Sequence, residues 1–400
     1  MRTSSFVPAD EPFFREWTAR RLRSRRSLAR AAEFAARLGL DVAGVPPPLT
    51  VVGSKGKGTT ATYASATLAA KGLRVGTITS PGYRTNRERI RVDGSAISTA
   101  EYEVLSAAVA SALPAGPARD GGYLSPTGLF TLAGAWWLVG AGCDALVLEA
   151  GIGGGSDEVS LFTPRTVAIT RIFDEHVGIL GATVYDIVRE KAAVVRPETR
   201  SVWTIPQDDQ VHAALLDALG RISTVSGHPT LRLPPGLSGR NAALGFQAAA
   251  DHAPGGTGAR VGDVLDTISL PGRLSVHHRP GGQTWIVDSA IDPVGVRAAL
   301  DWCRPVYGEP SSVVVAFPDG KRPAACRAEL AGCPVVPVAT ENRRLTFDDP
   351  VWDGQGRPLP VLASLDLDAL GPLVLALGTI SFVGEVLETL DVPTERSFRP

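Results

Sequence analysis

The sequence predicts an α/β protein with a mostly parallel central sheet and a second, smaller α/β domain. Short apolar, β-branched runs alternate with Ala-rich helical stretches, a pattern typical of a parallel sheet covered by helices. The pair Pro271-Gly272 then interrupts the chain, and a new alternation of strands and helices begins beyond it. We therefore expect one domain over residues 1–273 and another over residues 274–400.

The elements of the first domain follow from local patterns. Ser98 and Glu101 form a capping box that predicts the start of a helix. The other elements are predicted from apolar spacing. In chain order they are a helix at 28–39, strand Leu49–Val52, helix Ala61–Ala70, strand Arg74–Thr79, a helix from Ser98 to about Leu113, helix Leu129–Val139, strands Ala145–Glu149 and Thr166–Thr170, and helices Tyr185–Val194 and Ala242–His252.

The second domain shows the same alternation over a shorter length and predicts a smaller Rossmann-like α/β fold. Its elements, in order, are strand Thr284–Val287, helix Val294–Trp302, strand Ser312–Ala316, helix Pro323–Leu330, strands Val335–Val338 and Leu373–Leu377, and helix Phe382–Leu390.

Composition narrows the classes of function. The 400 residues carry a net charge of −1, so nothing points to nucleic acid or a membrane surface as a partner. No apolar run is long enough for a membrane span, and the Arg-rich N-terminal segment lacks the apolar core of a secretory signal. The four cysteines show no C-x-x-C spacing, which favours buried thiols in a reducing cytosol. We expect a cytoplasmic protein, monomeric or weakly homo-oligomeric, that acts on small molecules.

A glycine-rich loop, VVGSKGKGTT at residues 51–60, lies between a predicted strand and a predicted helix. The common pattern G-x-x-x-x-G-K-[ST] does not fit, because Gly58 follows Lys57 and Val51 stands where the first glycine belongs. Backbone N–H groups at a helix start, glycines and a lysine can still hold phosphate, although a flexible turn is the alternative. The candidate phosphate-binding residues are Gly53, Gly56, Lys57, Gly58, Thr59 and Thr60.

Lysine is scarce in a chain that otherwise uses arginine for its cations. A lysine that remains is a candidate for a compact amine that can lose its proton, which arginine cannot supply. The lysines are Lys55, Lys57, Lys71, Lys191 and Lys321.

The loop G-S-K-G-K-G-T resembles G-T-N-G-K-G-S of the folylpolyglutamate and dihydrofolate synthases, members of the Mur ligase superfamily. In that family a glycine does separate the lysine from the Ser/Thr. Further segments resemble the family in the same order. They are Thr79-Ser80-Pro81 with Glu88–Gly94, Leu148–Gly154 with Asp157, Glu175-His176 with Leu180-Gly181, Arg189–Ala192, Leu237–Gly239 with Asn241–Ala243, Pro271–Leu274 and Asp288–Pro293.

The resemblance implies a P-loop-containing central Mur-ligase domain that binds ATP and Mg²⁺ and joins a small-molecule acid to an amine through an acyl phosphate. It implies roles for particular residues. Lys57 would hold the β- and γ-phosphates, Ser80, Glu149, Thr59 and His176 would serve the metal, Asn241 would contact adenine, and Arg273 and Asp288 would contact ATP.

In the family the lysine that matches Lys191 is carbamylated by CO₂. This reaction needs a neutral amine, so burial must lower the pKa of the lysine. Taken singly, the candidates have plainer readings: Lys191 as a surface lysine whose stem packs on apolar neighbours, Glu149 as a surface carboxylate at a strand end, and His176 as a loop histidine.

Several positions depart from the family pattern. Gly82 replaces the histidine of T-S-P-H, Phe130 replaces the glutamate of T-x-F-E, and a His-Gln pair before Asn241 is missing. Ile291 and Asp292 replace the His-Asn of D-G-A-H-N-P. We therefore expect an ATP-dependent amide ligase acting on a non-folate acid. The alternatives are a genuine folylpolyglutamate or dihydrofolate synthase that adds glutamate to a folate or pteroate, and a nucleotide-binding paralogue that has lost catalysis.

Overall fold

The computed structural model describes residues 8–20, 24–116, 121–227, 236–255, 260–342, 344–352 and 357–400. These residues separate into two compact units. The larger unit contains residues 8–82, 86–269 and 395–400, and the smaller unit contains 83–85 and 270–394. We keep domain bounds of 1–273 and 274–400 as a proposal. No helix in the described ranges has the length and apolar composition to cross a bilayer.

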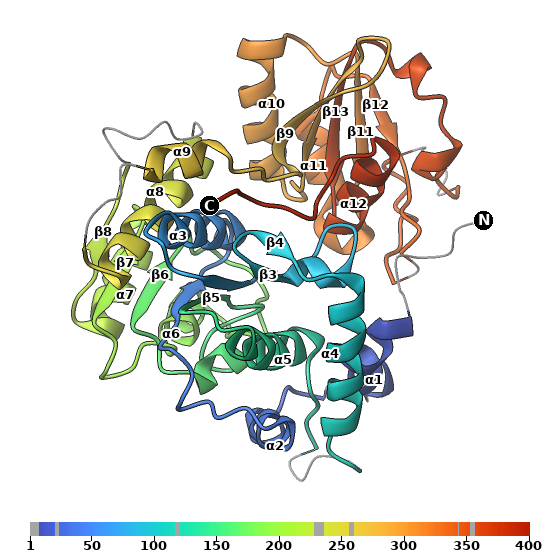
Figure 1. Ribbon diagram of the computed structural model, residues 1–400. Helices are drawn as coiled ribbons and strands as arrows, with labels where there is room; N and C mark the ends of the chain where they lie inside the picture. The colour runs from blue at the N-terminus through green and yellow to red at the C-terminus, as the bar shows by residue number, and fades with distance from the viewer. Residues whose placement is uncertain are drawn as a thin grey trace. The chain divides into compact units, whose positions relative to one another are not determined.

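The larger unit is built on an eight-stranded sheet, in the order β4-β3-β2-β5-β1-β6-β7-β8 (Figure 1). The strands from β2 to β8 in this order are parallel, while β3 and β4 form an antiparallel edge, so the mostly parallel sheet is confirmed. The strands are β1 (Leu49–Val52), β2 (Val75–Ile78), β3 (Ile90–Val92), β4 (Ser95–Ala96), β5 (Ala145–Glu149), β6 (Thr166–Ile169), β7 (Ser201–Thr204) and β8 (Ser223–Thr224).

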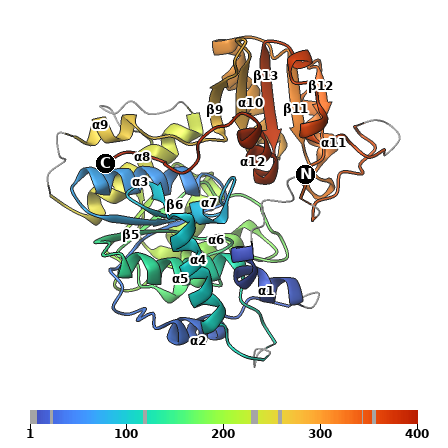
Figure 2. The same ribbon diagram turned by 45° about the vertical axis from the view of Figure 1, so that its right-hand side comes forward.

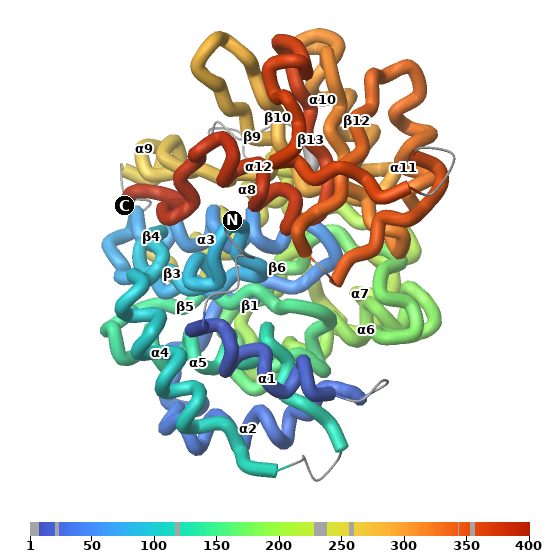
Figure 3. Tube along the Cα trace, turned by 90° about the vertical axis from the view of Figure 1, so that its right-hand side faces the viewer, coloured from blue at the N-terminus to red at the C-terminus, as the bar shows by residue number. Residues whose placement is uncertain are grey.

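Helices cover both faces of this sheet. Thr77 of β2 donates from its hydroxyl to Ser65 of α3 at 2.7 Å, whereas Ile78 packs against Gly134 of α5. Neighbouring residues of a strand point to opposite faces, and Figures 1 and 3 show α3 and α5 on opposite sides of the sheet. The helices are α1 (Glu11–Ala19), α2 (Leu28–Leu38), α3 (Lys57–Ala70), α4 (Thr99–Ala112), α5 (Pro126–Gly140), α6 (Val184–Ala192), α7 (Asp209–Leu219), α8 (Gly236–His252) and α9 (Val261–Asp266).

Local signals explain where the helices begin. The capping box of Ser98 and Glu101 is present at the start of α4, as the sequence predicts. Helix α3 begins at Lys57, four residues before the predicted start at Ala61. The difference arises because Gly56 adopts positive φ and ends the loop there. Helices α1, α7 and α9 and strands β3, β4, β7, β8 and β9 were not predicted.

The smaller unit has a five-stranded sheet in the order β12-β11-β13-β10-β9, parallel except for the edge strand β9 (Figure 2). Helices pack on both faces of a buried centre, as expected for a Rossmann-like fold. The elements are β9 (Arg273–His278), β10 (Thr284–Asp288), α10 (Pro293–Tyr307), β11 (Ser312–Ala316), α11 (Pro323–Glu329), β12 (Val335–Pro337), β13 (Leu373–Gly378) and α12 (Ile380–Thr389).

The C-terminal residues 395–400 return to the larger unit. The backbone of Ser397 donates to Gly94 at 2.8 Å, and the backbone of Ala96 donates to Glu395 at 2.7 Å. Phe398 is buried. This tail therefore holds the edge hairpin of β3 and β4, which no sequence pattern predicted.

Candidate functional site

The loop between β1 and α3 follows a path that needs glycine at two positions. Gly53 has φ +136° and Gly56 has φ +97°, values that other residues rarely adopt. A Cβ on Gly53 would lie 2.0 Å from Oγ1 of Thr170, and one on Gly56 would lie 2.1 Å from Nδ2 of Asn241. Close packing therefore fixes the course of the loop.

The N-terminus of α3 is suited to an anion. Gly56 is the N-cap and offers no side-chain cap. The first N–H groups of a helix lack intrahelical partners and lie at the positive end of its dipole, so a phosphate group fits there. Lys57 stands in the first turn, and its Nζ donates to the carbonyl of Gly53 at 3.0 Å.

Lys191 lies on α6 and reaches the same loop. Its side chain is 1% exposed, which excludes the reading as a surface lysine. The Nζ atom donates to the carbonyl of Gly53 at 2.9 Å and pairs with Oε1 of Glu175 at 2.9 Å. Two of the five lysines, Lys57 and Lys191, thus meet at one carbonyl oxygen.

The pKa values of this cluster are shifted by burial and by charge. Burial lowers the pKa of Lys191, the Glu175 carboxylate opposes that shift, and the Lys57 ammonium adds to it. Burial alone would raise the pKa of Glu175, but the charge and hydrogen bond of Lys191 hold it below its usual value. The arrangement favours loss of the Lys191 proton more than bulk water does.

Glu149 and Ser80 lie at the carboxyl end of the central strands. Glu149 is the last residue of β5, pairs with Val51 of β1, and is 5% exposed. Its Oε2 accepts the backbone N–H of Ser80 at 3.0 Å and lies 3.6 Å from where a Cβ on Gly58 would stand. The carboxylate is therefore buried beside the start of α3, and the surface reading is wrong.

The donor set fits Mg²⁺ better than a transition metal. Mg²⁺ prefers hard oxygens and is commonly held by one or two carboxylates together with water and substrate phosphates. Glu149 supplies a carboxylate, and Ser80 supplies a hydroxyl. Across the described residues no group of three or more His, Cys, Asp or Glu side chains is gathered for a metal. A metal here would therefore depend on phosphate oxygens for the rest of its ligands.

The remaining metal candidates lie in different settings. Thr59 is buried in the first turn of α3. Thr60 donates from its hydroxyl to the carbonyl of Asn241 at 3.0 Å, so it ties α3 to α8. His176 lies in an exposed loop with φ +49°, and its neighbour Glu175 is the residue that reaches Lys191.

Asn241 presents an unsatisfied polar atom beside the loop. The residue is 3% exposed, and its Oδ1 has no hydrogen-bond partner within the described structure. Buried polar atoms are nearly always bonded, so an orphan acceptor next to a phosphate-binding loop is suited to a ligand donor.

Arg273 and Asp288 belong to the smaller unit, where they lie at the adjoining ends of β9 and β10. Arg273 donates to the hydroxyl of Ser289 at 2.5 Å, and Asp288 accepts the backbone N–H of Leu274 at 2.9 Å. The structure thus brings these two close together, and their contact with a nucleotide remains a prediction.

Two departures from the family pattern have structural reasons. Asp292 is the N-cap of α10, and its Oδ1 accepts the N–H of Gly295 at 2.9 Å. Aspartate and asparagine cap helices about equally well. Ile291 packs against the buried cluster under α10.

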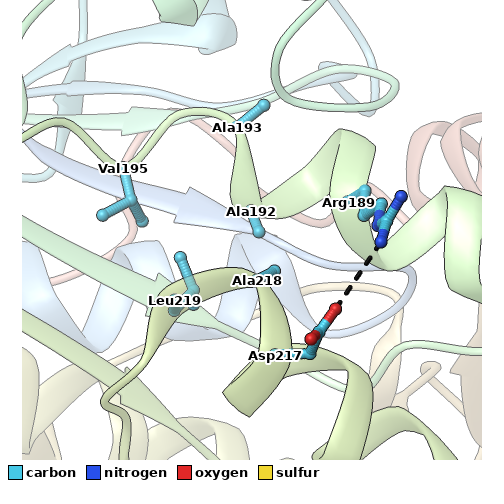
Figure 4. A pocket seen from close by; sticks show the side chains of 7 residues that line it. All are labelled: Arg189, Ala192, Ala193, Val195, Asp217, Ala218 and Leu219. Carbon is cyan, nitrogen blue, oxygen red and sulfur yellow. Dashed lines mark ion pairs between the residues drawn. The ribbon is translucent and has the colours of Figure 1, made fainter.

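An open cavity of about 440 Å³ lies where the ends of α6 and α7 meet (Figure 4). Arg189 and Asp217 face each other across it at 3.6 Å. It contains none of the predicted site residues, and its other lining residues are small or apolar. They are Ala192, Ala193, Val195, Ala218 and Leu219.

Sequence reasoning missed two residues of this site. Glu175 was given no role, although it belongs to the matched segment, in which an acidic residue precedes the histidine. Arg89, also within a matched segment, donates to the hydroxyl of Ser80 at 2.7 Å. Neither contact follows from a regular spacing, because the partners, 16 and 9 residues apart, are joined by loops.

The comparisons with known proteins point to one family. No protein-family model matches the chain. The chain is 35% identical over 196 residues to a probable bifunctional folylpolyglutamate synthase/dihydropteroate synthase of Halobacterium salinarum, covering 48% of this chain and 24% of that protein. It is 32% identical over 180 residues to the dihydrofolate synthase/folylpolyglutamate synthase of Escherichia coli, covering 45% of this chain and 41% of that one. The bovine mitochondrial folylpolyglutamate synthase is 28% identical over 298 residues, covering 64% and 50%.

Solved structures share the fold over nearly the whole chain. E. coli FolC in complex with DHPP and ADP superposes with a TM-score of 0.80 at 22% identity, covering 98% of this chain and 99% of that one. The apo form of L. casei FPGS gives 0.77 at 21% identity, covering 96% and 100%. The curated relatives named above are matched over only 24% to 50% of their own length. Sequence relatives and structural neighbours agree: part of the chain is similar in sequence to folylpolyglutamate and dihydrofolate synthases, and the chain shares the fold of the FPGS and FolC structures.

Proposed function

We propose that the protein is an ATP-dependent, ADP-forming ligase that joins a carboxylate to an amine. The carboxylate oxygen attacks the γ-phosphorus of ATP, the bond to the β-phosphate oxygen breaks, and ADP leaves. The amine nitrogen then attacks the acyl carbon, and inorganic phosphate and a proton leave. The observation that carries the proposal is the uncapped start of α3, with Lys57 and Glu149 beside it.

The loop and its surroundings account for nucleotide binding. The N–H groups of the first turn of α3 hold phosphate oxygens, and Lys57 turns from the Gly53 carbonyl to the β- and γ-phosphates. The free Oδ1 of Asn241 accepts a hydrogen bond from the nucleotide, which fits an adenine amino group. A structural neighbour was solved as an FPGS-AMPPCP-folate complex, and such ATP-analogue complexes support this assignment.

Ser80 and Glu149 would hold Mg²⁺, with Thr59 close to the phosphates and His176 as a ligand of a second ion. Mg²⁺ would supply charge neutralisation between the phosphates and the attacking carboxylate. The residues fit because Glu149 is ionisable, buried and at the helix start, and the Ser80 hydroxyl lies at the same strand edge.

We propose that Lys191 is carbamylated in the active enzyme. Its amine is buried and its pKa is lowered, so a neutral form is accessible. The ammonium first loses one proton, which the Glu175 carboxylate, 2.9 Å away, is placed to accept. Attack of the neutral amine on CO₂ then forms a nitrogen–carbon bond and releases a second proton to solvent. The carbamate then turns a cationic position at Gly53 into an anionic one.

The comparisons favour a folate or pteroate as the acid and glutamate as the amine, rather than the non-folate acid expected from the departures. The relatives are named for folate substrates, and the superposed structures include folate and DHPP complexes. The departures also carry less weight once seen in the fold, since Asp292 caps a helix as asparagine would.

The direct test is ADP release in a coupled assay with ATP, Mg²⁺, an acid and an amine. We expect release when dihydropteroate or a reduced folate is supplied with glutamate, and little when either is omitted. Release with another acid–amine pair and none with folates would support the non-folate reading. Tight ATP binding without turnover over a wide panel would support a paralogue that has lost catalysis.

A further inference from the structure

We propose that Arg89 binds the carboxylate of the acid substrate and holds it beside Ser80 and Glu149. The proposal rests on the proposed ligase function and deepens it by naming the residue that receives the attacking group. Three observations support it: the contacts of Arg89, its burial, and the lack of an ion pair to its guanidinium within the described residues.

Arg89 ends a short 3₁₀ turn (Asn86–Arg89) just before β3. Its Nε donates to Oδ1 of Asn86 at 2.8 Å, and its Nη1 donates to Oγ of Ser80 at 2.7 Å. The centre of the guanidinium lies 4.7 Å from the ring centroid of Phe130. The side chain is thus fixed by three contacts, one of them with a proposed metal ligand.

These contacts leave the positive charge largely uncompensated. Arg89 is 8% exposed, and in the described residues no carboxylate lies within ion-pair distance of it. Two other largely buried arginines of this unit are paired: Arg26 lies 2.9 Å from Asp157, and Arg30 lies 2.6 Å from Glu16. A buried cation without a counter-ion is costly, so such a site favours an anionic ligand.

The nearest carboxylates are engaged elsewhere. Asp10 accepts the hydroxyl of Tyr102 at 2.6 Å, and Glu149 accepts the backbone N–H of Ser80. Burial lowers the pKa of Arg89 to about 10, with partial compensation from Tyr102, Asp10, Glu149 and Glu88. The guanidinium is therefore still charged at neutral pH.

Phe130 of α5 leaves the guanidinium of Arg89 available to bind a carboxylate. An aromatic face attracts a cation without neutralising it. The family pattern has glutamate at this position, and a carboxylate there would occupy the guanidinium. A guanidinium has five N–H donors, and only two of them bond to Asn86 and Ser80. The others can form the paired hydrogen bonds that arginine makes with a carboxylate.

The position fits the chemistry of the first step. The acid must approach the γ-phosphate while Glu149 and the phosphates repel its negative charge. A fixed cation next to Ser80 offsets this repulsion and orients the carboxylate toward the start of α3. Arg89 itself forms and breaks no covalent bond and keeps its proton throughout.

The test compares Arg89→Gln and Arg89→Lys with Arg87→Gln. Arg87 belongs to the same turn but pairs with Glu395 at 3.2 Å, so it is a matched control. We expect Arg89→Gln to raise KM for the acid about 100-fold and Arg89→Lys about 10-fold, with KM for ATP within about threefold. Arg87→Gln should leave both unchanged. A rise in KM for ATP, or an unchanged KM for the acid, would overturn the proposal.

Phe130→Glu tests the same contact. A carboxylate at this position would pair with Arg89, so the affinity for the acid should fall. Phe130 is 1% exposed and stacks on Phe13 with ring centroids 4.0 Å apart, so the variant also loses stability, and Phe130→Leu, which loses the stacking without adding a charge, is the control. Calorimetric titration of the acid into the ADP-bound protein measures this without turnover. Tighter or unchanged acid binding by Phe130→Glu would contradict our assignment. A wild-type protein that binds the acid but never releases ADP would contradict the ligase function. In that case the binding titrations would still decide whether Arg89 holds the acid.

Discussion

Lys191 and Glu175 form an ion pair beneath the glycine-rich loop, with Nζ 2.9 Å from Oε1. The same Nζ donates to the carbonyl of Gly53, which also accepts from Lys57. The pair connects α6 and the loop after β6 to the start of α3. It therefore brings a candidate modification site and a candidate phosphate-binding residue to one oxygen atom.

We predict that Lys191→Ala loses most ligase activity and that acetate partly restores it. The acetate carboxylate can take the place of the carbamate in the space left by the side chain. Lys191→Arg should not be rescued, because the guanidinium fills that space and keeps its charge. Initial rates with and without acetate measure the effect. Full activity of Lys191→Ala without acetate would rule out the carbamate as a functional group.

We predict that Lys57→Ala lowers kcat by about 10² to 10³-fold, the scale for removing a preorganised charge contact in a transition state. The fold should survive, since within the described part of the chain the Lys57 amine bonds to loop carbonyls alone. Single-turnover rates and a thermal melt check both points. Wild-type kcat in this variant would remove the loop lysine from the mechanism.

Gly53→Ala should disturb the loop more than an ordinary glycine substitution. The new Cβ would meet Oγ1 of Thr170 at 2.0 Å and displace the carbonyl shared by both lysines. Gly72→Ala is the control, since Gly72 has φ +87° but a Cβ added there would meet no described atom within 4 Å. We expect about 1 kcal/mol of lost stability for the control. Gly53→Ala should lose more stability, because the added methyl overpacks the site, and at least about tenfold in ATP affinity. Equal behaviour of the two variants would show that the close contact has no role.

Glu158 gives a pH-dependent prediction. It is fully buried, and burial together with Asp157 raises its pKa from 4.5 to about 7, against the opposing charge of Arg26. The folded state therefore binds this proton more tightly than the unfolded state, and the contribution to stability falls as pH rises from 4.5 to 7. Glu158→Gln keeps a partner for Ser125, which bonds the carboxyl at 2.8 Å. It should be more stable than wild type at pH 8 by roughly 1 to 3 kcal/mol. Urea unfolding at pH 5 and pH 8 measures the difference, and a variant less stable than wild type at pH 8 would contradict the assignment.

The sequence predicted the parts of the protein that depend on local pattern. Strand β5 has the predicted bounds, and the capping box of α4 is present as expected. The loop was found because its glycines and Lys57 are contiguous. The contact of Arg89 with Phe130 and the pair of Lys191 with Glu175 were not found, because side chains distant in sequence meet only in the fold.

The departures at positions 291 and 292 show that a sequence difference can also be over-interpreted. From sequence they indicated a changed substrate, whereas in the fold Asp292 caps α10 and Ile291 packs against its buried neighbours. A substitution in a matched segment can therefore report on helix capping and packing instead of chemistry.

The central claim is that this protein joins glutamate to a folate or pteroate at the expense of ATP. Mass spectrometry of the product after incubation with the acid, glutamate, ATP and Mg²⁺ tests it most directly. We expect the acid to gain the mass of one or more glutamyl residues, with one ADP formed for each residue added. An unchanged acid, in a protein that binds ATP and retains its fold, would contradict the account.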